Sequence, residues 1–443
     1  MCSSILNASS RKSDDEHPEI GTGTKSLRAN SVPEFPMKTT PGKIFLRQIV
    51  TRARARWQRS TVSAQYSKIV GSWRSRGFVV LPCLPVRLSE RVDNVYTLLP
   101  NLTEFRDWAR SLAKREVTRF DASDGSPNLQ TLYRELEWLI EDSLMPSVGL
   151  DEDLKAFTQT VIAEEGRCVP SVALRLPITE LKDLWSKRIY NRVPLQYLTN
   201  TAHWRDIQLT VSSSVLIPRP ETELLIDFAR EVLDQLGSQR DHHASFDTLL
   251  SSPWLDLGTG SGAIAISLAQ ELKRHGGQRV IAVDKSVKAV EVAKHNIQRY
   301  GLQDKVEVLI GSWFEPIDTQ MRFAGILTNP PYIPSELLGS LQSEVQLHEP
   351  WLALDGGKGD GELHILSICG KVAEFLLPGG LFAIETHDFE QSRLVERLLK
   401  GTGSFCDIRI RQDYSGVSRF VTARRGTVSG ATCTSVLAHE HVC

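Results

Sequence analysis

The sequence predicts an α/β protein, in which a largely parallel sheet of seven strands with helices on both faces follows a small N-terminal helical domain. Three observations support this fold class. Short apolar segments alternate with amphipathic helical segments from residue 254 onward, the pattern of a doubly wound sheet. A glycine-rich turn joins the first of these strands to its helix. Upstream, residues 94–200 carry apolar side chains at helical spacing.

Composition narrows the function classes. The chain has 443 residues, with 52 Lys and Arg against 53 Asp and Glu, so its net charge of -1 argues against a basic surface for duplex nucleic acid. With 41% hydrophobic residues it has enough apolar mass to build cores, which excludes a fully disordered chain. No apolar run reaches the roughly 18 residues of a membrane-spanning helix. Seven scattered cysteines without a CxxC pair indicate neither a disulfide framework nor a zinc site, so we expect no metal.

Residues 1–90 are predicted to be a disordered leader. Residues 1–36 are polar, and from Met37 to Glu90 the chain is rich in arginine and hydroxyl residues, with no acidic residue before Glu90 itself. This composition is typical of an organelle transit peptide, and a basic arm for RNA or ribosomes is the alternative. We expect the mitochondrion as destination, with the plastid or the cytoplasm as alternatives. At the other end, residues 426–443 are small and polar and are predicted to be a flexible tail.

Residues 91–200 are predicted to form a separate helical domain. Leu132, Leu136 and Ile140 recur at helical spacing, and Leu181 with Trp185 belongs to a second such stripe. These stripes indicate a packed core and no ligand site. After Pro194 the period changes, and residues 204–211 alternate like a strand.

A helix is predicted to begin at Pro220. The fixed backbone angle of proline suits the first helical position, and Glu221 and Glu223 would place carboxylates at the positive helix end.

Residues 201–425 are predicted to form the α/β domain. Its strands are expected at Trp254–Leu257, Val280–Asp284, Val306–Ile310, Ala324–Thr328, Leu381–Glu385, Asp407–Arg411 and Phe420–Ala423. Helices are expected near 262–275, 286–300, 361–376 and 388–400. Only residues 412–419 separate the last two strands, too few for a parallel crossover, so these strands should pair as an antiparallel hairpin.

The turn Asp256-Leu257-Gly258-Thr259-Gly260-Ser261-Gly262 is the first candidate binding element. Glycines permit positive φ angles and a close approach of the backbone to a ligand, and nucleotides bind at this edge of open α/β sheets. The segment also satisfies the relaxed dinucleotide pattern, and a tight turn without a ligand is the remaining alternative.

Asp284 ends the next strand, where a carboxylate can accept hydrogen bonds from two ribose hydroxyls. Enzymes that use nicotinamide and enzymes that use S-adenosylmethionine share this feature. The alternative role is to cap the following helix, which Ser286 could equally do.

The sequence Asn329-Pro330-Pro331-Tyr332 follows the fourth strand and separates these possibilities. Two prolines stiffen the segment and remove two N–H groups, which leaves carbonyl oxygens, the Asn329 amide and a tyrosine ring. The Asn329 oxygen and the Pro330 carbonyl could accept both hydrogens of a planar NH2 group, and Tyr332 could pack on its flat face. The nitrogen lone pair would then point at an electrophile, so that catalysis would rest on alignment and need no strong base.

Together, the glycine turn, Asp284 and NPPY resemble the class I S-adenosylmethionine-dependent amino-methyltransferases, whose fold is a Rossmann-like seven-stranded sheet. Three further segments resemble the HemK/PrmC family of protein-(glutamine-N5) methyltransferases, which modify peptide chain release factors. They are Leu216–Glu223 (LIPRPETE), Gly311–Phe314 (GSWF) and Pro194–Tyr197 (PLQY). The resemblance covers roughly residues 129–425.

This resemblance implies a role for each motif. S-adenosylmethionine would be bound by Gly258, Thr259, Gly260, Ser261, Gly262, Asp284, Trp313 and Asn329. The glutamine of the release factor's Gly-Gly-Gln loop would be held by Asn329, Pro330, Pro331 and Tyr332, with Asn329, Pro330 and Tyr332 as the catalytic residues. Trp313 would border the adenine, with core packing as its alternative role, and LIPRPETE would form a lid. Glu385, which ends the fifth strand, could face the pocket or cap a helix, and it is left outside the predicted site.

Two residues depart from the family pattern. Asn200 stands where the family has glycine, and asparagine tolerates a left-handed backbone conformation. His387 follows Glu385 where the family often has a glycine-rich turn, and we interpret it as a surface residue.

The resemblance implies that the protein methylates the N5 nitrogen of that glutamine, with a release factor as partner and recognised by the helical domain. We expect a monomer without direct contact to nucleic acid or membrane. A nucleic-acid exocyclic-amine N-methyltransferase is the alternative, because NPPY suits any planar NH2 group, but it would need a basic channel. A non-catalytic S-adenosylmethionine-binding scaffold and a nicotinamide oxidoreductase are weaker alternatives, and the latter leaves NPPY unexplained.

Overall fold

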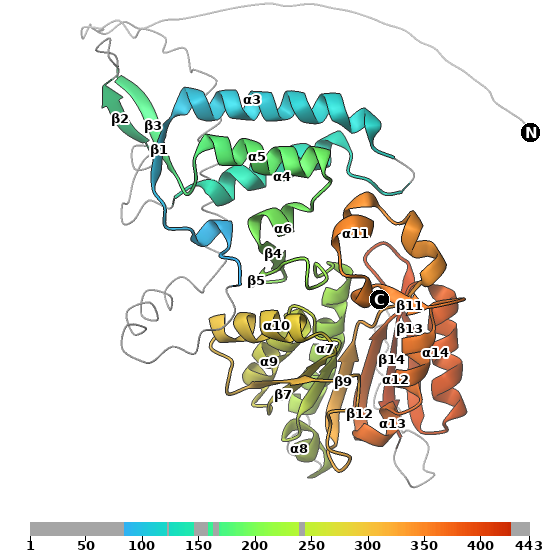
Figure 1. Ribbon diagram of the computed structural model, residues 1–443. Helices are drawn as coiled ribbons and strands as arrows, with labels where there is room; N and C mark the ends of the chain where they lie inside the picture. Colours follow the sequence, from blue (N-terminus) through green and yellow to red (C-terminus); the bar gives the residue numbers. More distant parts are fainter. Residues whose placement is uncertain (1–83, 122–123, 146–157, 163–167, 239–243, 427–443) are drawn as a thin grey trace, which may run out of the picture. The chain divides into compact units, whose positions relative to one another are not determined.

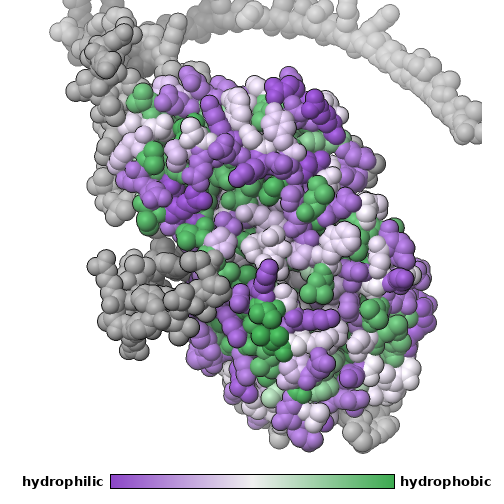
Figure 2. Space-filling view, in the orientation of Figure 1, coloured by the Kyte–Doolittle hydropathy of each residue, from purple (hydrophilic) through white to green (hydrophobic). Residues whose placement is uncertain are grey.

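A computed structural model describes residues 84–121, 124–145, 158–162, 168–238 and 244–426. Most of the predicted leader and nearly all of the predicted tail lie outside the described residues. Among the described residues, no helix combines the length and apolarity needed to cross a membrane. Polar side chains dominate the face drawn in Figure 2, and hydrophobic ones form small separate groups there.

The centre of the α/β region is a seven-stranded sheet with the order β13-β14-β12-β9-β6-β7-β8 (Figure 1). Its strands are β6 (Trp254–Leu257), β7 (Val280–Asp284), β8 (Val306–Ile310), β9 (Phe323–Thr328), β12 (Leu376–Glu385), β13 (Phe405–Gln412) and β14 (Ser418–Arg425). Strands β12, β9, β6, β7 and β8 are parallel, whereas β14 runs antiparallel to both β12 and β13. All seven predicted strands and the terminal hairpin are therefore confirmed.

Two apolar cores cover the two faces of this sheet, because successive strand side chains point to opposite faces. One core contains side chains of α7 (Leu224–Ser238), α9 (Ala263–His275) and α10 (Val287–Arg299). The other contains side chains of α12 (Leu363–Cys369), α13 (Val372–Phe375) and α14 (Phe389–Gly401). The single helix predicted near 361–376 is wrong in one respect, since Gly370 and Lys371 separate it into α12 and α13.

The N-terminal region is not all helical. It contains α3 (Leu99–Glu116), α4 (Leu129–Ser143), α5 (Ile178–Tyr190) and the short α6 (Leu195–Thr199). A three-stranded antiparallel sheet accompanies them, with β1 (Val95–Leu98), β3 (Cys168–Leu174) and β2 (Thr158–Ile162) in the order β1-β3-β2. The prediction of a small helical domain is therefore incomplete, because strands as short as β1 leave little periodic signal beside the long helical stripes.

The last residues of the predicted leader, 84–90, belong to the described structure. Leu88 belongs to the short 3-10 helix η2 (Leu88–Glu90) and is buried in the core of the N-terminal region. Arg87 is buried too, and its Nε donates to the Thr210 hydroxyl at 3.0 Å. Composition alone does not reveal the long-range partner of Arg87. The end of the leader predicted from composition therefore lies several residues too far along the chain.

A β-hairpin follows α6. Strands β4 (Thr201–Trp204) and β5 (Ile207–Thr210) pair antiparallel, so the extended segment predicted at 204–211 is mostly the second strand of a hairpin. Asn200 has a φ of 52°, the left-handed conformation expected for it. Pro220 precedes a 3-10 turn, η5 (Glu221–Glu223), that leads into α7, so the α-helix begins slightly later than predicted.

The segment between β9 and α12 is irregular. It contains β10 (Ile333–Pro334), which pairs with β11 (Asp355–Gly357), and the short helix α11 (Ser343–His348). The remaining short elements are α8 (Ala244–Leu250), η3 (Val117–Arg119), η6 (Ser335–Ser340) and η7 (Trp351–Ala353).

Candidate active site

The glycine turn lies between β6 and α9, as predicted. Gly258, Gly260 and Gly262 all have positive φ, at 77°, 54° and 85°. The backbone N–H groups of Gly258 and Thr259 donate to the carbonyl of Val283, which fixes the turn to the neighbouring strand. The turn therefore exposes backbone without side chains at the carboxyl end of β6, where a ligand can approach closely.

Asp284 connects this turn to the start of α10. Its Oδ2 accepts a hydrogen bond from the Gly260 N–H and its Oδ1 accepts one from the Ser286 N–H, both at 2.8 Å. Ser286 caps α10 by accepting from the Ala289 N–H, so Asp284 is not needed as a cap. Burial raises the pKa of Asp284. A carboxylate oxygen has more than one lone pair, so each oxygen retains capacity for a ribose hydroxyl.

Asp256, at the end of β6, stabilises the glycine turn through two hydrogen bonds. Its fully buried carboxylate accepts the Thr259 hydroxyl at 2.6 Å and the Ala265 N–H at 3.1 Å, both at Oδ2. Burial raises the pKa of Asp256 to about 7, and among the described residues its Oδ1 has no hydrogen-bond partner.

Trp313 and Asn329 both lie close to Gly258. A Cβ atom on Gly258 would stand 3.5 Å from the Trp313 ring and 3.8 Å from the backbone oxygen of Asn329. Trp313 follows β8 with a φ of 50°, is half-buried, and packs edge-on against His364 at 5.3 Å between ring centroids. The structure thus brings the ends of β6, β8 and β9 together around the glycine turn.

The NPPY segment follows β9, and its amide and ring have defined partners. The Asn329 amide nitrogen Nδ2 donates to the Thr222 hydroxyl at 3.0 Å, and the Tyr332 hydroxyl donates to Glu385 at 3.1 Å. The backbone carbonyl of Tyr332 accepts a hydrogen bond from Gln391 at 2.9 Å. Pro330 is buried and Pro331 is half-buried. Hydrogen bonds to side chains that are distant in the sequence therefore hold the NPPY segment in place.

Two residues outside the predicted site, Thr222 and Glu385, are central to this bracing. Thr222 comes from LIPRPETE and donates its hydroxyl hydrogen to Glu385 Oε2 at 2.7 Å. Glu385 ends β12 and is 1% exposed, and burial raises its pKa to about 7. The threonine within LIPRPETE was available as a signal in the sequence, whereas nothing local distinguished the glutamate from a strand-end residue.

The PLQY segment and strand β4 contact LIPRPETE and the residue before it. The Tyr197 hydroxyl, from PLQY, donates to the Val215 carbonyl at 2.7 Å, and Trp204 Nε1 donates to the Arg219 carbonyl at 2.7 Å. The Arg219 guanidinium pairs with Glu349 at 2.9 Å. LIPRPETE therefore contacts NPPY through the hydrogen bond between Thr222 and Asn329. His387 is exposed, as interpreted from the sequence.

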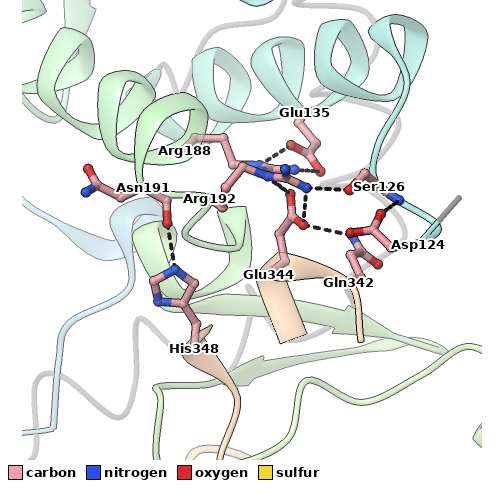
Figure 3. A network of polar contacts seen from close by, with 9 residues as sticks. All are labelled: Asp124, Ser126, Glu135, Arg188, Asn191, Arg192, Gln342, Glu344 and His348. Atoms are coloured by element: carbon pink, nitrogen blue, oxygen red, sulfur yellow. Dashed lines mark hydrogen bonds and ion pairs between the residues drawn. The ribbon is translucent and has the colours of Figure 1, made fainter. Parts of the chain in front are cut away.

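A buried ion cluster links the N-terminal helices to the segment after NPPY (Figure 3). Arg188 and Arg192 both point at Glu344 of α11, with nitrogen–oxygen distances of 2.8 Å and 2.6–2.8 Å. Arg188 also donates to both carboxylate oxygens of Glu135 on α4, and it is only 2% exposed. Arg192 additionally donates to the Ser126 hydroxyl. This cluster fixes α5 against α11.

Every predicted site segment therefore lies at the carboxyl edge of the parallel strands. The residues suit a nucleoside cofactor, since glycine backbone, an acidic strand end and an aromatic ring converge there. Within the described residues, no group of His, Cys, Asp and Glu side chains could hold a metal ion.

Comparisons with known proteins agree with this geometry. The chain matches the Methyltransferase small domain family over residues 228–338. It is 44% identical over 297 residues to the release factor glutamine methyltransferase of Thermosynechococcus vestitus, covering 65% of this chain and 96% of that protein. The namesake protein of Gloeobacter violaceus is 43% identical (56% of this chain, 80% of that protein), and that of Synechocystis is 38% identical (57% and 80%).

Proposed function

Because the chain belongs to the family of release factor glutamine methyltransferases, we propose that it methylates a peptide chain release factor on the side-chain amide nitrogen, N5, of the glutamine in the Gly-Gly-Gln loop. The protein is an S-adenosylmethionine-dependent enzyme of the class I methyltransferase fold. The observation that carries the proposal is the position of NPPY at the end of β9, with the Asn329 backbone oxygen beside Gly258.

S-adenosylmethionine supplies an electrophilic methyl group on a sulfonium. We assign its binding to Gly258–Gly262, Asp284 and Trp313, with Asn329 at the border to the substrate. The two oxygens of Asp284 are oriented by backbone N–H groups, which leaves lone pairs for the ribose hydroxyls.

The residues of NPPY orient the substrate amide. An amide nitrogen is a weak nucleophile because its lone pair is delocalised into the carbonyl. The Asn329 side-chain oxygen and the Pro330 carbonyl accept the two amide hydrogens, which holds the group in one plane and directs the nitrogen at the methyl group. Pro331 stiffens the segment, and the Tyr332 ring packs on the face of the amide. Transfer of the methyl group to the nitrogen would leave S-adenosylhomocysteine, and the methylated nitrogen would release one of its two hydrogens as a proton to water. No strong base is required before transfer, so alignment carries most of the catalysis.

We propose that the N-terminal helical region recognises the body of the release factor and that the enzyme acts as a monomer. The buried cluster at Glu344 supports the first part, because it ties that region to the segment after NPPY. Size-exclusion chromatography with light scattering, alone and with the release factor, tests the oligomeric state and the formation of a complex.

We also propose an organelle destination. The arginine-rich and acid-poor residues 38–89 support import, and the mitochondrion is the destination predicted from the sequence. The plastid and the cytoplasm are the alternatives. Imaging of the full chain with a C-terminal fluorescent tag, beside a variant without residues 1–83, tests whether the protein is imported and into which organelle. A cytoplasmic signal that is identical for both would contradict it.

The activity is tested by methyl transfer from labelled S-adenosylmethionine to a purified release factor. The matched control substrate is the same factor with the loop glutamine replaced by alanine, and single-stranded DNA and RNA oligomers test the nucleic-acid alternative. We expect label on the unmodified factor alone. Label on the oligomers, or equal label on the alanine substrate, would contradict the proposal.

A further inference from the structure

An asparagine amide can present either its oxygen or its NH2 group toward a substrate, because a rotation by half a turn exchanges two groups of nearly equal size. Only the oxygen can accept a hydrogen from a substrate amide. The proposed role of Asn329 therefore depends on which way its amide faces, and NPPY alone does not determine that.

The contacts of Thr222 determine it. The Thr222 hydroxyl has one hydrogen, and it donates that hydrogen to Glu385 Oε2 at 2.7 Å. The same hydroxyl oxygen lies 3.0 Å from Asn329 Nδ2. With its hydrogen committed to a carboxylate, the hydroxyl can only accept from Asn329, so the Asn329 NH2 group must face Thr222.

Glu385 controls this arrangement from the end of β12. An ionised carboxylate accepts hydrogen bonds and donates none, so both of its hydroxyl partners must donate to it. Those partners are Thr222 at Oε2 and Tyr332 at Oε1, the latter at 3.1 Å. One carboxylate thus orients both polar side chains of NPPY, one through a threonine and one directly.

We infer that Thr222 and Glu385 are positioning residues that lock the Asn329 amide with its oxygen toward the substrate. The inference rests on the proposed function only for what the oxygen binds. LIPRPETE then has a role beyond that of a lid, since its threonine fixes the direction of a hydrogen bond in the active site. Among the described residues, the Asn329 side-chain oxygen has no hydrogen-bond partner, as a group reserved for substrate requires.

Thr222→Val is the direct test, because valine keeps the shape of threonine and removes its hydroxyl. The Asn329 amide would then be free to turn its NH2 group toward the substrate NH2 group. We expect kcat to fall roughly 10- to 100-fold, the effect of an unmade hydrogen bond in an aligned site, with S-adenosylmethionine affinity unchanged. Thr222→Ser keeps the hydroxyl and should restore most of kcat.

Thr199→Val is the matched control. Thr199 is also buried, and its hydroxyl donates to the Leu195 carbonyl at 3.1 Å, away from NPPY. We expect it to lower thermal stability about as much as Thr222→Val while kcat stays at the wild-type value. Wild-type kcat in Thr222→Val, or an equal loss in Thr222→Ser, would overturn the inference. So would a loss of kcat in Thr199→Val as large as in Thr222→Val.

The orientation can also be read without turnover, which separates this inference from the proposed function. The side-chain amide signals of Asn329 in an NMR spectrum are those that disappear in Asn329→Asp. We expect one slowly exchanging amide hydrogen in the wild type and fast exchange of both in Thr222→Val. Fast exchange of both in the wild type would refute the lock, whatever the substrate. A locked amide in a protein that methylates no release factor would instead refute the function alone.

Discussion

Replacing Arg188 by methionine should destabilise the protein substantially. The guanidinium makes three hydrogen bonds to two carboxylates, at 2.5 Å and 3.2 Å to Glu135 and at 2.8 Å to Glu344, and it is 2% exposed. Methionine fills a similar volume, but Glu135 would lose two hydrogen bonds and Glu344 would lose one. Removing one member of a buried ion pair typically costs about 3–5 kcal/mol.

The structure places this variant at the lower end of that range. Glu344 keeps two hydrogen bonds from Arg192, at 2.8 Å and 2.6 Å, and the Glu135 side chain retains 14% exposure, so water can partly solvate it. We therefore expect a loss of about 3 kcal/mol in the free energy of unfolding, a large part of the 5–15 kcal/mol of a typical domain.

Urea unfolding followed by circular dichroism measures this loss, with Arg279→Met as the control. Arg279 pairs with Glu307 at 3.1 Å, and both side chains are about half exposed, so the control should lose less than about 1 kcal/mol. An equal, small loss in both variants would refute the reasoning, because it would mean that the cluster is solvated and does not hold α5 against α11.

Three further predictions concern the active site. Asn329→Ala removes the acceptor oxygen, so we expect kcat to fall at least ~100-fold, while calorimetry should show S-adenosylmethionine binding that is largely retained. Lowering the pH through about 7 should reduce kcat, because burial raises the pKa of Glu385 to about 7 and its protonated form can donate to Thr222, which releases the Asn329 lock. Arg419 lowers the pKa of this carboxyl and Glu221 raises it, while Tyr332 donates a hydrogen bond to it. Glu385→Gln removes the titrating group, so it should flatten the profile between pH 6 and pH 8, roughly one unit either side of that pKa. An unchanged pH profile in Glu385→Gln would contradict this account. Gly258→Ala should weaken S-adenosylmethionine binding and lower stability by about 1 kcal/mol, since its φ is 77° and the new Cβ would lie against Trp313 and the Asn329 backbone oxygen. Gly237→Ala, with open space around it, should not weaken binding.

The sequence predicted the site best where a motif with recognisable chemistry directly follows a strand of the parallel sheet. The glycine turn, Asp284 and NPPY each follow a short apolar strand, and parallel strands bring their carboxyl ends to one edge, so their meeting could be predicted. Gly258 beside both Trp313 and Asn329 is the outcome.

The remaining features depend on contacts between distant segments. Thr222 and Glu385 are 163 residues apart, and Arg188 and Glu344 are 156 apart, so no local pattern connects them. A lone glutamate at a strand end gives the same local signal whether it caps a helix or orients an active-site amide. The small sheet of β1, β2 and β3 was missed for a related reason. Strand β1 pairs with β3, about 70 residues further along the chain, and the helices α3 and α4 between them dominate the periodicity of that region.

The central claim is that a proline-braced segment aligns a glutamine amide nitrogen for methylation, and tandem mass spectrometry of the release factor tests it most directly. The factor is incubated with S-adenosylmethionine and either the wild-type enzyme or Asn329→Ala, and fragment ions then locate the methyl group. The account predicts one methyl group on the side-chain nitrogen of the loop glutamine with the wild-type enzyme and almost none with the variant. A methyl group on another residue, or equal methylation by both proteins, would contradict it.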